Sequence, residues 1–176
     1  MQFDWPAKIV KLVRWKEIAH TFDKAGALPW HLPNVAAAEE QVAAAESATG
    51  TKFPTPYKRF LCHADGWRGF LITIDLFGTR DFISGRVTDL LKRAELRDFI
   101  GSLPNSGEIL PIGASEFDLD VFLLVSAGSS IGPGQIIWFA NEEVERFGDF
   151  EEFFTAVIDY NARGAAKLRS ANEIKH

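Results

Sequence analysis

The sequence predicts a single-domain α+β protein whose mixed, mainly antiparallel sheet is flanked by helices. The 176 residues fit one domain and are enough to bury a continuous core. Fifteen Phe and five Trp supply large apolar rings, which such a core must bury. Amphipathic helical patterns lie towards both ends of the chain, and most strand-like segments lie between them. That order fits an α+β fold better than a βαβ repeat.

The first element lies near the N-terminus, at residues 9–15. This segment fits either a strand or a helix. The spacing of its apolar residues, with Lys and Arg between them, favours an amphipathic helix: Ile9, Leu12 and Val13. A loop that contains two Pro residues follows at residues 26–33.

The second helix is expected between Asn34, a favourable N-cap, and Gly50, a favourable stop. Its apolar residues recur at helical spacing: Val35, Ala38, Val42 and Ala45.

The third helix has strong local signals at both ends. Thr55 is expected to cap it, and Pro56 falls at the first helical position, where its missing N–H costs nothing. We expect Gly66 to end the helix in the left-handed conformation, with Trp67 packed back on the last turn. The apolar face consists of Tyr57, Phe60, Leu61 and Ala64.

The middle of the chain is dominated by strand-like segments. They are bounded by Gly and Pro and lie at Gly69–Phe77, Ile109–Ile112, Val121–Val125 and Gln135–Ala140. A charged helix, capped by Thr88, is expected to run to about Phe99 between the first and second of these.

The closing helix has the clearest pattern in the chain. Asp149 and Glu152 form a pair typical of a capping box. Gly164 is expected to interrupt the helix before a short basic tail. The apolar face is formed by Phe150, Phe153, Phe154, Val157 and Ile158.

Composition excludes several classes of protein. No apolar run reaches the length of a membrane span, and no signal peptide is evident. The single cysteine, Cys62, cannot form an internal disulfide or a thiolate metal site. We therefore expect a cytoplasmic protein that does not contact membranes.

Candidate catalytic residues are few. Cys62 and His63 are adjacent, but neighbours on a helix point about 100° apart and do not face each other. Both lie in the last helical turn, where the negative end of the helix dipole raises a thiol pKa. We therefore interpret Cys62 as a packed cysteine, and we expect no catalytic residues.

Metal and cofactor motifs are also incomplete. The segment 118–120 resembles the start of a calcium loop, but the Gly and the terminal Glu of such a loop are missing. The segment 132–134 lacks the spacing and the Lys of a phosphate loop. We expect neither a metal nor a cofactor.

Charge is unevenly distributed, although the net charge is only −5. Residues 108–159 hold eleven Asp and Glu against one base, Arg146, which is a local balance of −10. The larger single-sign segment is thus acidic, so we expect a basic protein as partner and no direct contact with nucleic acid. The candidate partner-binding residues are Glu116, Asp118, Asp120, Glu142, Glu143 and Glu145.

One run of residues has a family-like order: Glu46, Gly50, Phe53-Pro54, Tyr57, Phe60-Leu61 and Asp65-Gly66-Trp67. This order resembles the N-terminal signature of the SUKH superfamily. Asp65 stands where that signature more usually has Asn, and Phe53 where it has Leu. Three later segments resemble the family in the right order: Leu76–Gly78 with Asp81, Leu110–Gly113 with the acids up to Asp120, and Phe150–Phe154.

The resemblance covers about residues 35–160. We therefore expect a SUKH-like domain at residues 35–176, preceded by an N-terminal extension at residues 1–34 that holds a helix or strand and a loop. The resemblance implies a mixed sheet flanked by helices and a non-enzymatic role. It identifies a fold, and a function inferred from a fold is an analogy.

Bacterial members of this superfamily are commonly immunity proteins, which bind and neutralise a cognate toxin. Fungal relatives regulate cell-wall synthesis and signalling. The resemblance therefore implies a protein-binding module of the immunity type, with a toxin as partner. Two alternatives stay open: a regulatory or scaffold adaptor for endogenous proteins, and a hydrolase that uses Cys62 or an unrecognised carboxylate pair.

Overall fold

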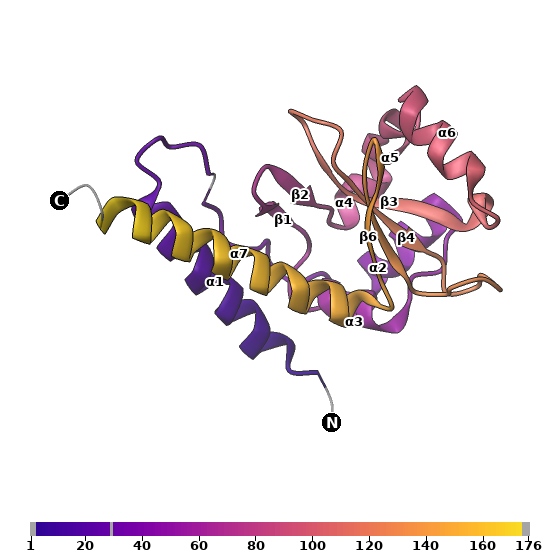
Figure 1. Ribbon diagram of the computed structural model, residues 1–176. Helices are drawn as coiled ribbons and strands as arrows, with labels where there is room; N and C mark the ends of the chain where they lie inside the picture. Colours follow the sequence, from indigo (N-terminus) through magenta and orange to yellow (C-terminus); the bar gives the residue numbers. More distant parts are fainter. Residues whose placement is uncertain (1–2, 29, 174–176) are drawn as a thin grey trace.

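A six-stranded antiparallel sheet forms the centre of the computed structural model, which describes residues 3–28 and 30–173 (Figure 1). Each strand pairs with its neighbours in the sequence, so the order across the sheet is β1-β2-β3-β4-β5-β6. The strands are β1 (Trp67–Leu71), β2 (Ile74–Leu76), β3 (Ile109–Ser115), β4 (Val121–Val125), β5 (Ile136–Ala140) and β6 (Glu142–Phe147). The predicted α+β class is confirmed, and the five strand pairings are all antiparallel.

Helices cover both faces of this sheet (Figure 1). On one face the long helix α7 lies alongside α1, and α3 packs on α7. On the other face α6 reaches the sheet through Phe99, whose ring stacks on Phe139 of β5 at 4.6 Å. The helices are α1 (Trp5–Phe22), α2 (Glu39–Thr49), α3 (Thr55–Leu61), α4 (Thr79–Ile83), α5 (Arg86–Leu90), α6 (Ala94–Ser102) and α7 (Phe150–Glu173), with a 3₁₀ turn at Ser106–Glu108.

Aromatic side chains fill the core between α1, α3 and α7. The ring of Phe150 lies 4.9 Å from that of Tyr57 and 5.2 Å from that of Phe60. Trp5 joins the same cluster, with its ring 5.3 Å from Phe154. All five side chains are buried, so α1 shares one core with α3 and α7. The predicted apolar faces of the third and closing helices are therefore confirmed.

The closing helix is longer than predicted. Its start is as expected, because Asp149 Oδ1 accepts a hydrogen bond from the Glu152 N–H at 2.8 Å. The Glu152 carboxylate in turn accepts from the N–H of Gly148 at 2.6 Å. Gly164 does not interrupt the helix, which continues to Glu173. A single Gly costs a helix only about 1 kcal/mol, and the packing of α7 against α1 outweighs that cost.

The segment at residues 9–15 belongs to a helix, as its apolar spacing favoured. The prediction for Asn34 was wrong. The second helix begins after Ala38, whose N–H donates to Gln41 Oε1 at 2.8 Å. Asn34 instead donates from Nδ2 to the backbone oxygen of Asp65 at 2.8 Å, which holds it against the loop after α3. The predicted stop at Gly50 is confirmed by its left-handed conformation.

The third helix begins one residue earlier than predicted, because its N-cap is Pro54; Thr55 is its first residue and Pro56 its second. The helix ends at Leu61, earlier than predicted. Gly66 has the expected positive φ of 84°, but it lies beyond the helix and does not cap it. Trp67 was also misplaced: it opens β1, and its Nε1–H donates to the His31 carbonyl at 2.8 Å.

Two more segments differ from the prediction. Gly69–Phe77 is a hairpin of two strands, β1 and β2, because the chain turns at Ile72. Thr88 lies inside α5, whose N-cap is Gly85, and the expected single helix is divided into α5 and α6. The three strands predicted at residues 109–112, 121–125 and 135–140 are confirmed.

Candidate partner-binding surface

Three hairpin turns meet at one end of the sheet (Figure 1). Ser115 at the end of β3 pairs with Ile74 at the start of β2, and Val121 of β4 pairs with Phe139 of β5. Consequently the turns at residues 72–73, 116–120 and 141 all point the same way. We refer to these three turns together as the turn end.

The turn end exposes apolar side chains. Phe117, at the tip of the β3–β4 turn, is 82% exposed, and Ile72, in the β1–β2 turn, is 56% exposed. Ile72 also has a φ of 54°, a conformation that β-branched residues rarely adopt. Strain of this kind costs about 1–3 kcal/mol and is concentrated at functional sites. Phe117 and Ile72 are therefore candidate contacts for a partner at this end of the sheet.

Asp118 and Asp120 organise the β3–β4 turn. Asp118 Oδ1 accepts a hydrogen bond from the Asp120 N–H at 3.1 Å. Burial alone would raise the pKa of Asp118, but hydrogen bonds from the Asp120 N–H and from the Ser115 and Thr73 hydroxyls lower it. Asp120 Oδ1 accepts from Trp138 Nε1 at 2.5 Å. Burial, together with the nearby charge of Asp118, raises the pKa of Asp120.

Glu116 lies at the end of an ion-pair network centred on Arg86. The Arg86 guanidinium donates to Asp75 at 3.0 Å, to Asp81 at 3.1 Å and to Glu116 at 3.5 Å. It also stacks over the ring of Phe77 at 4.6 Å. Arg86 thereby links β2 and α4 to the β3–β4 turn. Nothing in the local sequence pattern distinguishes Arg86 from the other basic residues of this region.

The three Glu residues of β6 do not point the same way. Glu143 pairs with Phe139 and binds Arg146 at 2.7 Å; this hydrogen bond lowers the pKa of Glu143. Glu145 pairs with Trp138 and accepts a hydrogen bond from the Tyr160 hydroxyl on α7. Burial and this contact raise the pKa of Tyr160 to about 12. Glu142 makes no side-chain hydrogen bond or ion pair within the described residues.

The structure therefore brings together four of the six candidate acids. Glu116, Asp118 and Asp120 lie in the β3–β4 turn with Phe117, and Glu142 follows the β5–β6 turn at the same end of the sheet. Glu143 and Glu145 lie further along the edge strand β6, on its two faces. No apolar residue of this surface was among the predicted site residues. The turn residues Ile72 and Phe117 could have been found only by predicting the hairpins.

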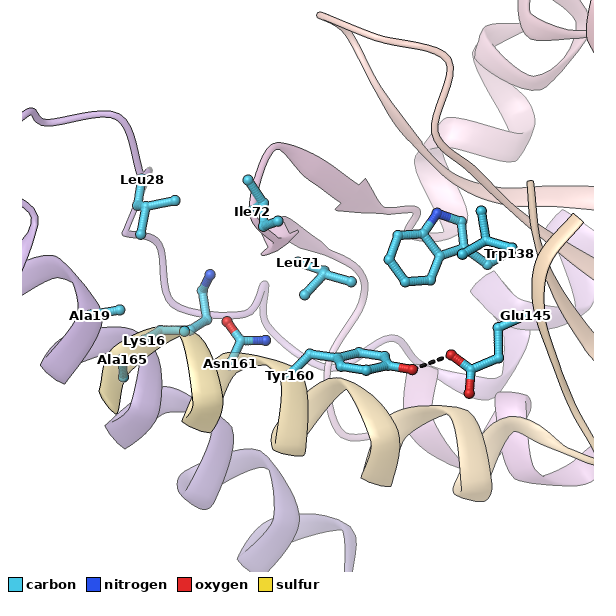
Figure 2. Close-up of a pocket in the computed structure, with 12 residues that line it drawn as sticks. Lys16, Ala19, Leu28, Leu71, Ile72, Trp138, Glu145, Tyr160, Asn161 and Ala165 are labelled. Atoms are coloured by element: carbon cyan, nitrogen blue, oxygen red, sulfur yellow. Dashed lines mark hydrogen bonds between the residues drawn. The ribbon is translucent and has the colours of Figure 1, made fainter. Parts of the chain in front are cut away.

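A cavity of about 420 Å³ opens beside the turn end, between α1, α7 and the sheet (Figure 2). Its walls are mainly apolar and include Leu71, Ile72 and Trp138. The buried side chain of Lys16 lines it from α1, and Tyr160 lines it from α7. Glu145 also lines the cavity and was a predicted site residue, whereas the other residues named here were not.

Cys62 lies away from this surface, at the C-cap of α3. Burial, with the nearby charges of Glu39 and Asp65, raises the pKa of its thiol. His63 does not face it, since His63 Nδ1 lies 2.7 Å from the Arg59 carbonyl oxygen. This arrangement disfavours a thiolate nucleophile.

Metal sites and membrane-spanning helices were considered for the part of the chain that the structure describes. Between residues 3 and 173, with residue 29 left aside, no three His, Cys, Asp or Glu side chains are grouped to hold a metal ion. No helix in the same part of the chain has the length and apolarity to cross a membrane.

The residues that carry the family resemblance, between Glu46 and Trp67, stabilise the fold. Glu46 Oε1 accepts from the Phe53 N–H at 2.7 Å and lies 3.2 Å from Lys58 Nζ. The Tyr57 hydroxyl donates to the Phe77 carbonyl at 3.3 Å. These contacts tie α2, α3 and the strand region together, and they lie outside the turn end.

Comparison with models of protein families gives a match. The model of the SMI1 / KNR4 family (SUKH-1) matches residues 36–156, more than half of the chain. The match begins after α1 and includes all six strands and the start of α7. Among curated protein sequences there is no significant match.

Proposed function

The chain belongs to the SMI1/KNR4 family (SUKH-1), and we propose that it is an immunity protein that binds and neutralises a cognate bacterial toxin. SUKH proteins are commonly toxin-immunity proteins. The observation that carries the proposal for this chain is the turn end, where the 82%-exposed Phe117 stands between the exposed acids Glu116 and Asp118. The partner we propose is a toxin with a basic surface.

The turn end combines an exposed aromatic side chain, which can act as an anchor in an interface, with charged residues around it. Exposed aromatic rings that fill a pocket on a partner supply much of the affinity of protein interfaces. Phe117 is such a ring, and Ile72 adds a second apolar contact on the same end of the sheet. Charges around the anchor accelerate association with an oppositely charged partner. Glu116, Asp118 and Glu142 are exposed acids placed to do so.

A binding role also agrees with the low reactivity expected of the Cys62 thiol. The raised pKa of Cys62 and the orientation of His63 argue against a hydrolase that uses Cys62. We place the protein in the cytoplasm, where an immunity protein would meet a toxin that acts inside the cell. A single cysteine is compatible with that reducing compartment.

The experiment is co-expression with a candidate toxin whose gene lies next to this one. We expect the chain to restore growth of cells that express the toxin, and the two purified proteins to form a complex by calorimetry. Phe117→Ala should weaken the complex by about 2 kcal/mol, or roughly thirtyfold. Ile131→Ala is the matched control, because Ile131 is 48% exposed but lies in the β4–β5 loop at the opposite end of the sheet.

Failure to protect cells, together with stable binding to an endogenous protein, would replace immunity with the adaptor function. Protection that survives Phe117→Ala but is lost with Ile131→Ala would move the interface to the opposite end of the sheet.

A further inference from the structure

The cavity beside the turn end has a floor of two helices and two apolar walls. Lys16 and Ala19 of α1 and Gly164 of α7 are among the residues of the floor. Leu71 and Ile72 line one side, and Trp138 lines the other (Figure 2). The volume of about 420 Å³ falls within the range of about 300–1,000 Å³ typical of small-molecule sites.

Lys16 brings a buried positive charge to one end of this cavity. Its side chain is 6% exposed, and its Nζ donates to the Gly69 carbonyl. Within the described residues, no carboxylate lies within ion-pair distance of it. An ammonium has three N–H donors, and the carbonyl uses one of them. Figure 2 shows the ammonium directed between Leu28 and Leu71.

A buried ammonium without a counter-ion is unfavourable, because a charge taken out of water needs compensation by an opposite charge. Burial lowers the pKa of Lys16 to about 8, which reflects this cost. An anionic group entering the cavity at this end would supply the missing counter-ion. The chemistry of the site therefore favours a ligand with one negative charge at the Lys16 end.

The opposite end of the cavity determines the orientation of such a ligand. Glu145 and Tyr160 lie there, joined by their hydrogen bond (Figure 2). The Glu145 carboxylate would repel an anion, so the negative group cannot occupy that end. Between the two ends lie the side chains of Ile72 and Trp138, which suit a hydrocarbon chain or ring.

We propose that this cavity binds a small apolar monocarboxylate, with its carboxylate on Lys16 and its hydrocarbon part between Ile72 and Trp138. The proposal does not depend on the toxin partner. It gives the chain a second binding site, distinct from the surface around Phe117. Because Ile72 contributes to both, an occupied cavity would also contact the β1–β2 turn.

The test is calorimetric titration of the full chain with decanoate and, separately, with decanol, its uncharged counterpart. We expect saturable binding of one decanoate per chain. Decanol should bind at least about tenfold more weakly, because it lacks the charged contact. Trp138 provides a second readout, since its fluorescence should change on binding and the change should disappear in Trp138→Phe.

Two variants test the site independently. Lys16→Met should weaken decanoate binding at least about tenfold while leaving decanol unchanged. Gly164→Leu should abolish binding of both, because a Cβ at Gly164 meets no atom within 4 Å and the added side chain would occupy the floor. Ala166→Leu is the matched control on the exposed side of the same helix and should bind as the native protein does.

Equal affinity for decanoate and decanol, or decanoate binding that survives Gly164→Leu, would overturn the proposal. No saturable binding of decanoate would do the same. The Gly164→Leu result stands even if Lys16→Met fails to fold, because the two changes lie on different helices.

Discussion

The carboxylate of Asp65 accepts two hydrogen bonds from Thr79, one from its backbone N–H at 2.6 Å and one from its hydroxyl at 2.7 Å. Thr79 is the first residue of α4, a helix of five residues that is too short to be stable alone. Asp65 therefore fastens the start of α4 to the loop that follows α3. SUKH signatures more usually have Asn at this position; here both oxygens of the acidic side chain are used.

Replacing Asp65 should be costly. Asp65→Ala removes both acceptors and leaves the Thr79 N–H and hydroxyl unpaired in a buried position. We expect a loss of about 2–4 kcal/mol in the free energy of unfolding. Asp65→Asn should lose less, since its amide retains one acceptor oxygen. Urea denaturation provides the measurement.

Asp89→Ala is the control for this prediction. Asp89 is exposed and forms an ion pair with the exposed Lys92, so its loss should change stability by less than about 0.5 kcal/mol. Equal effects of Asp65→Ala and Asp89→Ala would show that the Thr79 contact contributes little.

Gly66 and Gly78 allow two backbone segments to meet next to this contact. A Cβ on Gly78 would lie 2.3 Å from the Asp65 carbonyl oxygen, and one on Gly66 would lie 2.5 Å from the Gly78 nitrogen. Gly78→Ala should therefore destabilise the protein by about 3 kcal/mol or more, because only backbone could yield. Thermal and urea unfolding would measure the loss.

Gly164→Ala adds the same methyl group where it meets nothing. Gly164 lies inside α7, and Ala is the better helix former, so this variant should gain about 0.5–1 kcal/mol. If Gly78→Ala proved as stable as Gly164→Ala, the close approach of the two segments would be wrong.

Elements of the fold were predictable where the apolar residues in the sequence are the ones that the structure buries. The apolar face of α7 and the strands β3 to β5 are of this kind. The strand β6 does not, because Glu142, Glu143 and Glu145 carry no strand-like apolar alternation. Its pairing with β5 comes from the open edge of the sheet, and charged residues are common on such an edge strand. The hairpin at Ile72 was missed because a β-branched residue occupies the turn.

The candidate surface was predictable only in part, because contacts between distant segments are not visible in the sequence. The acids were visible as a charge imbalance, but their local contacts with Arg86 and Trp138 arise from tertiary packing. Lys16 looks like its neighbour Lys11 in the sequence. It is buried because it reaches the Gly69 carbonyl of β1, 53 residues away.

The buried Lys16 should make stability depend on pH. Its pKa is lowered from 10.5 to about 8 in the folded protein. Between pH 8 and 10 the unfolded chain retains a proton on Lys16 that the folded chain loses, so the free energy of unfolding should rise with pH. Over this pH range the free energy of unfolding should rise by about 2–3 kcal/mol. Urea midpoints at pH 7, 8, 9 and 10 would measure the rise.

The comparison with Lys16→Met isolates this contribution, because titration of other groups is common to both proteins. Lys16→Met should lack the rise, and Lys11→Met, at an exposed position on the same helix, should keep it. The same pH dependence in all three proteins would mean that Lys16 is not the source.

The Cys62 thiol should react slowly. Because burial and nearby carboxylates raise its pKa, less thiolate is present at pH 8 than for an ordinary cysteine. We expect iodoacetamide to alkylate the folded protein several-fold more slowly than the urea-unfolded chain, as followed by mass spectrometry. Cys62→Ala should leave binding and protection intact. Faster alkylation in the folded state would indicate an activated thiol and revive the hydrolase alternative.

The acids of the turn end should control the rate at which the protein meets a basic toxin. The double variant Glu116→Lys and Glu142→Lys should lower the association rate constant about tenfold at low salt, because electrostatic steering acts before contact. The difference should shrink near 1 M salt, where the screening length falls to about 3 Å. Stopped-flow mixing would measure both. Glu40→Lys with Glu95→Lys makes the same change in net charge on α2 and α6, so it should slow association much less. If both double variants slowed association equally, net charge would be responsible and the turn end would have no special part in steering.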